Sequence, residues 1–255
     1  TPHTPMSTTF IRHSVFAVVA AALPLAAQKQ SPDTARVSPI VVSATRLPMA
    51  LGALPVAVTV IRGEDLRLRG IATVADALND VTSAYLAQSG SQGGTTSLFL
   101  RGGESKYVKV LIDGVPANDP GGVYDFASLT TDNVERIEVV RGPVSVIHGA
   151  DAVTGVVQII TRRGVGPQLV ETDLRVGTAS RAPLTGTSPP KSVRTWDAST
   201  SLSGALPSGS YSVALARHVS GGLYELNNRY LNNVLSGRFL FSPGEGTDIR
   251  LSLRY

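Results

Sequence analysis

The feature that most constrains the fold of this chain is a regular alternation of apolar and polar residues after Pro167. In the first alternating segment, Val170 and Leu174 alternate with Glu171 and Asp173. Because successive side chains of a β-strand point to opposite faces, each such segment is predicted to be a strand with one apolar and one polar face. The segments are 169–177, 195–204, 211–219, 234–241 and 249–255.

The connections between these segments alternate in length. Residues 207–209 and 242–247 are short connections, whereas 179–193 and 220–233 are longer. Short turns at one end and longer loops at the other are typical of an outer-membrane β-barrel. A soluble β-sandwich also alternates and is the alternative, but the asymmetry of the connections favours the barrel. Tyr211 and Tyr255 are candidates for its aromatic girdle.

About five strands cannot close a barrel, and open sheet edges are not tolerated in lipid. We therefore expect residues 165–255 to be the N-terminal part of a transmembrane β-barrel, and the chain to be a fragment of a longer protein. The predicted fold is an α+β domain followed by antiparallel transmembrane β-barrel strands, with the barrel truncated.

The N-terminus resembles a signal for export. Arg12 and His13 precede an apolar stretch from Val15 to Leu25, and small residues follow at Ala26 and Ala27. This arrangement predicts a signal peptide over residues 1–27, with a short buried helix as the alternative. The polar residues that follow predict an extended arm over 28–50.

Within this arm, residues 38–46 form a short β-prone run between Pro39 and Pro48. An extended segment of this kind can add a strand to the exposed sheet edge of a partner. It can equally be the first strand of the next domain, and the residues alone leave both readings open.

Residues 51–164 predict a small α+β domain. Strands are expected near 56–61, 97–101, 107–112, 137–140 and 156–160, with a hairpin turn at Asp113-Gly114. A helix is expected within 71–86, capped by Thr73, and a second short helix at 129–134. The glycine-rich and polar stretches 88–96 and 118–124 predict exposed loops.

Composition excludes several classes of function. The chain has no cysteine, so it has no thiolate metal site or nucleophile. A net charge of +4, dispersed along the chain, does not indicate nucleic acid as a partner. The four histidines are scattered, and no nucleophile triad, phosphate loop or metal-ligand spacing is found. We expect no enzyme activity, no cofactor and no metal site.

Several motifs resemble those of the TonB-dependent outer-membrane receptors. The run 40–44 (IVVSA) resembles their TonB box. The runs 98–102 (LFLRG), 110–116 (VLIDGVP), 134–143 (VERIEVVRGP), 149–152 (GADA) and 155–161 (GVVQIIT) resemble motifs of their plug domain, in the same order. Within the family, the chain looks most like the cobalamin receptor branch.

The resemblance implies a plug domain over 51–164 that sits inside the barrel, in the outer membrane of a Gram-negative bacterium. The ligand, cobalamin or a ferric siderophore, is then expected at the plug apices, and TonB at the box. The implied TonB box is Pro39, Ile40, Val41, Val42, Ser43 and Ala44. The apical ligand-binding candidates are Gln88, Ser89, Ser91, Gln92, Asn118, Asp119 and Tyr124. A receptor that acts mainly in signalling or ligand binding is the alternative function.

The resemblance also implies that the charged residues Arg101, Glu138 and Arg141 contact the barrel wall, and the alternative is that they are solvated charges at strand ends. Glu138 and Arg141 lie in or next to an apolar run, where a charge must be paired or reach water. The resemblance places their partners on wall strands beyond Tyr255, so we expect these charges to be unpaired in this chain.

Overall fold

The computed structural model describes residues 41–42, 49–50, 57–181, 191–222, 228–244 and 246–255. The predicted signal peptide lies outside the described residues, as does most of the arm. No helix in the described ranges is long and apolar enough to cross a membrane.

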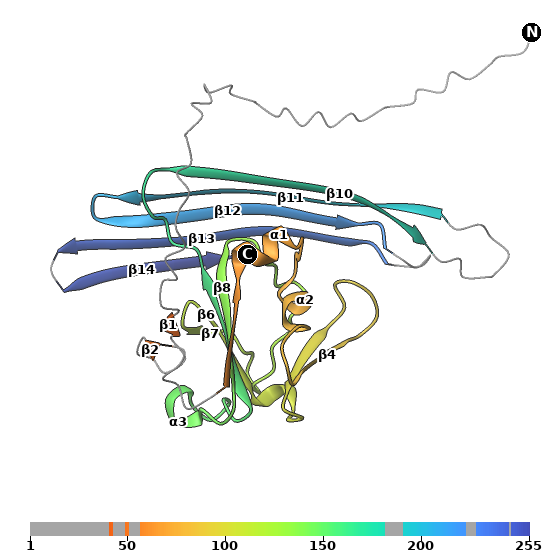
Figure 1. The fold of residues 1–255 in the computed structure, drawn as a ribbon, viewed down its shortest axis with the longest axis horizontal. Helices are drawn as coiled ribbons and strands as arrows, with labels where there is room; N and C mark the ends of the chain where they lie inside the picture. The colour runs from red at the N-terminus through yellow and green to blue at the C-terminus, as the bar shows by residue number, and fades with distance from the viewer. Residues whose placement is uncertain (1–40, 43–48, 51–56, 182–190, 223–227, 245) are drawn as a thin grey trace, which may run out of the picture. The chain divides into compact units, whose positions relative to one another are not determined.

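The described elements follow one another as an α+β domain and a C-terminal sheet (Figure 1). The first part comprises β1 (Val41–Val42), β2 (Met49–Ala50), β3 (Ala57–Arg62), α1 (Gly63–Leu68), α2 (Val74–Leu78), β4 (Ala84–Gln88), β5 (Thr96–Leu100), the 3-10 turn η3 (Ser105–Tyr107), β6 (Val108–Ile112), β7 (Val115–Pro116), β8 (Val134–Arg141), α3 (Ser145–His148) and β9 (Gly155–Thr161). The C-terminal sheet comprises β10 (Leu169–Arg181), β11 (Lys191–Leu206), β12 (Gly209–Ser220), β13 (Tyr230–Gly244) and β14 (Thr247–Arg254).

The α+β domain is built on a sheet of order β3-β8-β9-β6-β7. β8 pairs antiparallel with both β3 and β9, and β6 pairs parallel with β9. The apolar residues Ile137, Val139, Val157 and Ile159 are fully buried in the main core. The strands predicted near 137–140 and 156–160 are therefore confirmed, with α3 in the loop between them. The hairpin predicted at Asp113-Gly114 is also confirmed, because β6 and β7 pair across it.

The helical predictions are only partly correct. The hydroxyl oxygen of Thr73 accepts a hydrogen bond from the backbone N–H of Asp76 at 3.1 Å, so the predicted cap of α2 is confirmed. The helix ends at Leu78, however, because the chain then turns through Ser83, which has a φ of 66°, into β4. β4 pairs with β5, and this strand was missed.

The short helix predicted over 129–134 is wrong. Thr130 instead makes an isolated β-bridge with Thr73, and the N–H of Val134 bonds to the carbonyl of Thr131. Asn133 has a φ of 59°, a left-handed conformation that ends any helix and that asparagine tolerates. The segment is a tight turn that leads into β8.

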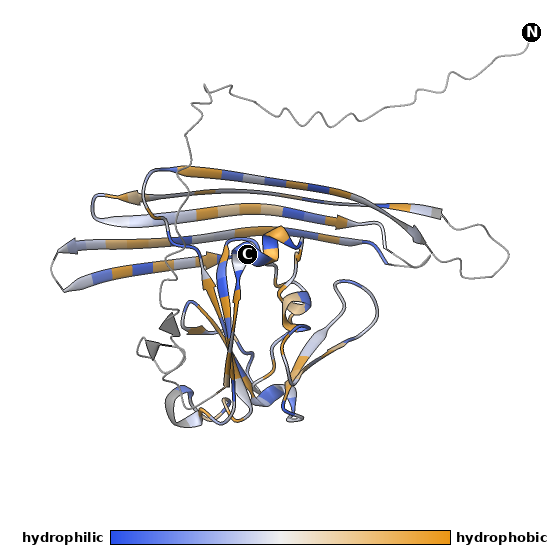
Figure 2. Cartoon of the chain, in the orientation of Figure 1, coloured by the Kyte–Doolittle hydropathy of each residue, from blue (hydrophilic) through white to orange (hydrophobic). Residues whose placement is uncertain are grey.

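The C-terminal sheet is fully antiparallel, in the chain order β10 to β14. Figure 2 shows apolar and polar residues alternating along its strands. On β12, Ser212, Ala214 and His218 are buried while Leu215 is exposed. On β14, Ile249, Leu251 and Leu253 are all exposed. The five predicted strands are thus confirmed, with an apolar outward face and a polar inward face that meets the α+β domain.

Only part of the predicted TonB box can be placed. Val41 pairs with Ala50 and Val42 with Met49, in a two-residue antiparallel ladder. Pro39, Ile40, Ser43 and Ala44 lie outside the described residues.

Candidate functional site

A polar pocket joins the first predicted apical loop to the end of the C-terminal sheet. Ser89, Ser91 and Gln92 from the β4–β5 loop line it, together with Ser128, Asn228, Arg229, Tyr230 and Asn232. Its volume is about 480 Å³. The described lining carries hydroxyl and amide groups and one guanidinium but no carboxylate, so it suits a polar, neutral or anionic ligand.

Gln88 supports this loop from within. Its side-chain amide donates a hydrogen bond to the carbonyl of Ser91 at 2.7 Å. On the facing strand, the amide of Asn232 donates to the carbonyl of Ser128 and to the hydroxyl of Tyr230, both at 3.0 Å. These bonds hold the two walls of the pocket in place. Ligand contact by the loop stays a prediction.

In the second predicted loop, 118–124, two of the candidate side chains are used within the α+β domain. Asn118 donates both amide hydrogens, to the carbonyls of Val108 and Gly122, and its Oδ1 accepts from the N–H of Val110. Tyr124 packs edge-on against Phe126 at 4.8 Å between ring centroids, and burial raises the pKa of its hydroxyl. Of the candidates in this loop, Asp119 has the exposed side chain.

A buried amide clamps the α+β domain to two strands of the C-terminal sheet. The hydroxyl of Ser212 on β12 donates to Oδ1 of Asn133 at 2.6 Å, and Nδ2 of Asn133 donates to the hydroxyl of Ser236 on β13 at 3.0 Å. All three residues are buried. Since an unsatisfied buried amide costs roughly 1–3 kcal/mol, this clamp selects one docked position.

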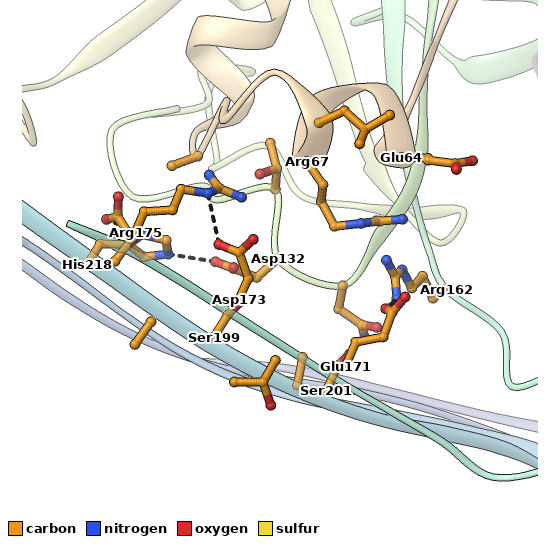
Figure 3. A pocket seen from close by; sticks show the side chains of 18 residues that line it. Glu64, Arg67, Asp132, Arg162, Glu171, Asp173, Arg175, Ser199, Ser201 and His218 are labelled. Carbon is orange, nitrogen blue, oxygen red and sulfur yellow. Dashed lines mark hydrogen bonds and ion pairs between the residues drawn. The ribbon is translucent and has the colours of Figure 1, made fainter. Parts of the chain in front are cut away.

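Next to the clamp, a histidine bridges the two parts. His218 on β12 bonds through Nε2 to Asp132 at 2.7 Å (Figure 3). Through Nδ1 it also bonds to Asp197 on β11, at 2.9 Å. Carboxylates only accept, so an imidazole protonated on both nitrogens satisfies both bonds.

A second ion pair crosses the interface near the other end of the sheet. Arg238 on β13 bonds to Oδ1 of Asp113 at 2.7 Å and to the carbonyl of Thr161 at 2.9 Å. Arg254 on β14 donates to the carbonyl of Thr130 at 3.0 Å. The polar faces of β12, β13 and β14 are therefore all bonded to the α+β domain.

Over β10 and β11 the two parts are separated by a charged cavity of about 460 Å³ (Figure 3). α1 contributes Glu64 and Arg67, and β10 contributes Glu171, Asp173 and Arg175. The ion pair between Arg162 and Glu171 spans its edge. Burial, reinforced by the positive charge of Arg162, lowers the pKa of the Arg67 guanidinium.

The expected unpaired state is wrong for Glu138, but it holds for Arg141, which forms no ion pair with any described residue. Glu138 is fully buried and pairs with Arg136 at 2.8 Å. Arg141 donates to the carbonyl of Thr82 and to the hydroxyl of Thr59, both at 3.0 Å. Arg136 on the same strand thus neutralises Glu138, whereas Arg141 is bound only by neutral oxygens of the α+β domain. Arg101 is exposed in the turn after β5. The contact of Arg101, Glu138 and Arg141 with a barrel wall stays a prediction.

The interface residues themselves were missed as contacts. Asp113 was interpreted only as a turn residue, and Asn133 as part of a helix. The polar face of β12 to β14 was the available signal, because a buried polar face requires partners. In the described ranges, no group of three or more His, Cys, Asp and Glu side chains could hold a metal ion.

The comparisons with known proteins agree with this geometry. Residues 50–156 match the family described as the TonB-dependent Receptor Plug Domain. By this match the α+β domain is similar to the plug domain of TonB-dependent receptors, and we refer to it as the plug domain. The chain is also 34% identical over 122 residues to the vitamin B12 transporter BtuB of Vibrio vulnificus. The aligned residues make up 48% of this chain and 20% of that protein. The resemblance to TonB-dependent receptors, and to the cobalamin branch, is thus confirmed.

Solved structures share the fold of the plug domain and the sheet together. The siderophore receptor PirA from Acinetobacter baumannii matches with a TM-score of 0.59 at 22% identity, over 77% of this chain and 31% of its own. The ferric citrate transporter FecA, in its unliganded form, matches with a TM-score of 0.65 at 20% identity, over 79% of this chain and 31% of its own. The ferripyoverdine receptor of Pseudomonas aeruginosa matches with a TM-score of 0.67 at 14% identity, over 83% of this chain and 26% of its own. The chain therefore spans about a third or less of the relatives it matches.

Proposed function

We propose that the full-length protein is an outer-membrane receptor that imports a scarce nutrient, cobalamin or a ferric siderophore, under the control of TonB. The chain supplies the plug and the first wall strands of this transporter. The role is that of a transporter and not of an enzyme.

The observation that carries the proposal is the polarity of the C-terminal sheet. Its inward face bonds to the plug domain through Asn133, Asp132 and Asp113. Its outward face exposes large apolar side chains such as Leu174, which is 69% exposed, and Leu251, which is 60% exposed. A polar face on a plug and an apolar face on the outside are what the wall of a plugged membrane barrel requires.

The two ends of the plug domain then take different roles. The polar pocket of Ser89, Gln92 and Asn232 lies beside the long β12–β13 connection, which is the extracellular side of such a barrel. Hydroxyl and amide groups there suit a ligand rich in polar atoms. The TonB box lies at the opposite, periplasmic end of the pathway and binds TonB by strand addition.

The test is energy-dependent uptake by cells that carry the full-length protein. Substituting Val41→Pro removes a backbone donor from the box, so strand addition fails. We expect uptake of cobalamin or a ferric siderophore to fall to background, while equilibrium binding of that ligand is unchanged. Ala35→Pro, in the same arm but outside the box, is the matched control and leaves uptake intact.

Other outcomes are equally clear. Uptake that persists in Val41→Pro cells removes the role given to the box. A wild-type protein that binds ligand but never accumulates it inside cells is a receptor for signalling or ligand binding, and not a transporter.

A further inference from the structure

The outward face of the C-terminal sheet carries very few charges. Of the side chains that alternation places on this face of the described strands, only Arg194 on β11 and Arg217 on β12 are charged. The acidic residues of these strands, Asp173 and Asp197 among them, belong to the opposite face. Two cations on an otherwise uncharged surface require an explanation, because a lipid-facing charge is unfavourable.

The two arginines flank a single tryptophan. The guanidinium of Arg217 lies over the ring of Trp196, 5.8 Å from its centroid. Arg194 is two residues from Trp196 on the same strand, so both side chains lie on one face. Both arginines are exposed, and neither forms an ion pair with any described residue.

The cluster lies near one edge of the apolar surface. Arg194 is three residues from the start of β11, and Arg217 is three residues from the end of β12. Both of these strand ends lead into the long connections, which are the extracellular ones in a barrel of this kind. An arginine on the lipid face is far less costly near a membrane interface than at the bilayer midplane. Tryptophan is also enriched at interfaces. The physics therefore places the cluster at the level of the outer headgroups.

We propose that Arg194, Trp196 and Arg217 form a binding site for the phosphate groups of lipopolysaccharide in the outer leaflet. The inference rests on the proposed outer-membrane location. Guanidinium groups bind phosphate through two parallel N–H donors, and no nearby carboxylate of the described outward face competes for them. The Trp196 ring orients Arg217 and packs against the acyl chains below the headgroups.

The test uses the full-length protein, purified from outer membranes and placed in lipid nanodiscs. Lipopolysaccharide binding is measured by titration for wild type, for the double variant R194Q/R217Q and for R250Q. A cation near an anionic membrane surface contributes about 1 kcal/mol, or about fivefold in affinity, so the double variant loses roughly 25-fold. Arg250 is exposed on the inward face, so R250Q is the matched control and binds like wild type.

Two further measurements fix the nature of the site. The variant R194K/R217K keeps both charges but loses the bidentate geometry, and an intermediate affinity is expected. The binding difference between wild type and R194Q/R217Q shrinks as salt is raised, because screening weakens exposed charge interactions. A loss in R194Q/R217Q that R194K/R217K partly restores supports a phosphate site that uses arginine geometry.

The proposal is overturned if R194Q/R217Q binds lipopolysaccharide as tightly as wild type. It is also overturned if inorganic phosphate or phosphatidylglycerol vesicles compete as well as lipopolysaccharide, since the site then recognises any anion. Measurements of ligand uptake and of outer-membrane location distinguish failure of the lipid site from failure of the proposed function. Normal uptake with unchanged lipid binding in R194Q/R217Q removes only the lipid site, whereas a wild-type protein absent from outer membranes removes the proposed function.

Discussion

At the scale of single residues, the docking of the plug domain depends on a few buried polar pairs, of which Asp113 and Arg238 show the energetics most clearly. The side chain of Asp113 is 5% exposed and that of Arg238 is 13% exposed. Asp113 also accepts from the N–H and the hydroxyl of Thr161. Substituting Arg238→Met leaves this carboxylate buried without its cation, and we expect a loss of roughly 3–5 kcal/mol in the free energy of unfolding. Urea titration of the full-length protein, followed by proteolysis of the plug domain, measures it.

A double-mutant cycle supplies the control. Asp113→Asn keeps the shape of the side chain and removes the charge, so the double variant D113N/R238M has no uncompensated charge. We expect it to be more stable than R238M alone. If the losses of the two single variants simply add, the pair is not coupled and Asp113 acts only through Thr161.

At the scale of elements, α1 packs closely against β8 at Gly63, because this residue has no side chain to separate the two backbones. A Cβ built on Gly63 would overlap the carbonyl oxygen of Val134, and its φ is not in the left-handed region. Gly63→Ala is therefore expected to destabilise the plug domain by roughly 1–3 kcal/mol through steric overlap alone. Gly244→Ala is the matched control, because a Cβ there meets no atom within 4 Å. Equal thermal midpoints for the two variants would show that α1 moves away at no cost.

Elements with long periodic patterns could be predicted from the sequence, and those fixed by close contacts could not. The β8–β9 hairpin follows from apolar residues such as Val139 and Val157, which are buried in the core, and the five strands of the C-terminal sheet follow from their alternation of apolar and polar residues. α1 escaped prediction because its position depends on the contact of Gly63 with β8. The turn at Asn133 escaped because a left-handed φ and two serines far along the chain determine it.

The same limit applies to the candidate site. The loop between β4 and β5 was correctly predicted from its composition, and Ser89, Ser91 and Gln92 line one pocket, but its apical position and its contact with a ligand stay predictions. The amide of Asn118 is instead used within its own loop, which composition cannot reveal. Local pairing of Glu138 with Arg136 was also open to prediction from their i, i+2 spacing on one strand face.

At the scale of the whole molecule, the proposed function requires one face of the C-terminal sheet to contact lipid and the other to contact the plug domain and water. Leu202 and Ser201 are adjacent on β11 and test this requirement directly. Leu202 pairs with Val170 and Val213 on the outward face, whereas Ser201 lines the charged cavity. Leu202→Arg places a cation against hydrocarbon, at a cost of up to roughly 2–4 kcal/mol that decreases toward the interfaces.

Ser201→Arg adds the same group one residue away, on the face that lines the charged cavity beside Glu171. We expect the full-length Leu202→Arg protein to fold poorly into lipid vesicles and the Ser201→Arg protein to fold like wild type, as measured by the folded fraction during urea titration. Because the two substitutions share their strand and their chemistry, the difference between them reports only which face meets lipid. Equal folding of both variants would mean that the outward face lies in water, and the β-sandwich alternative would then account better for the alternation.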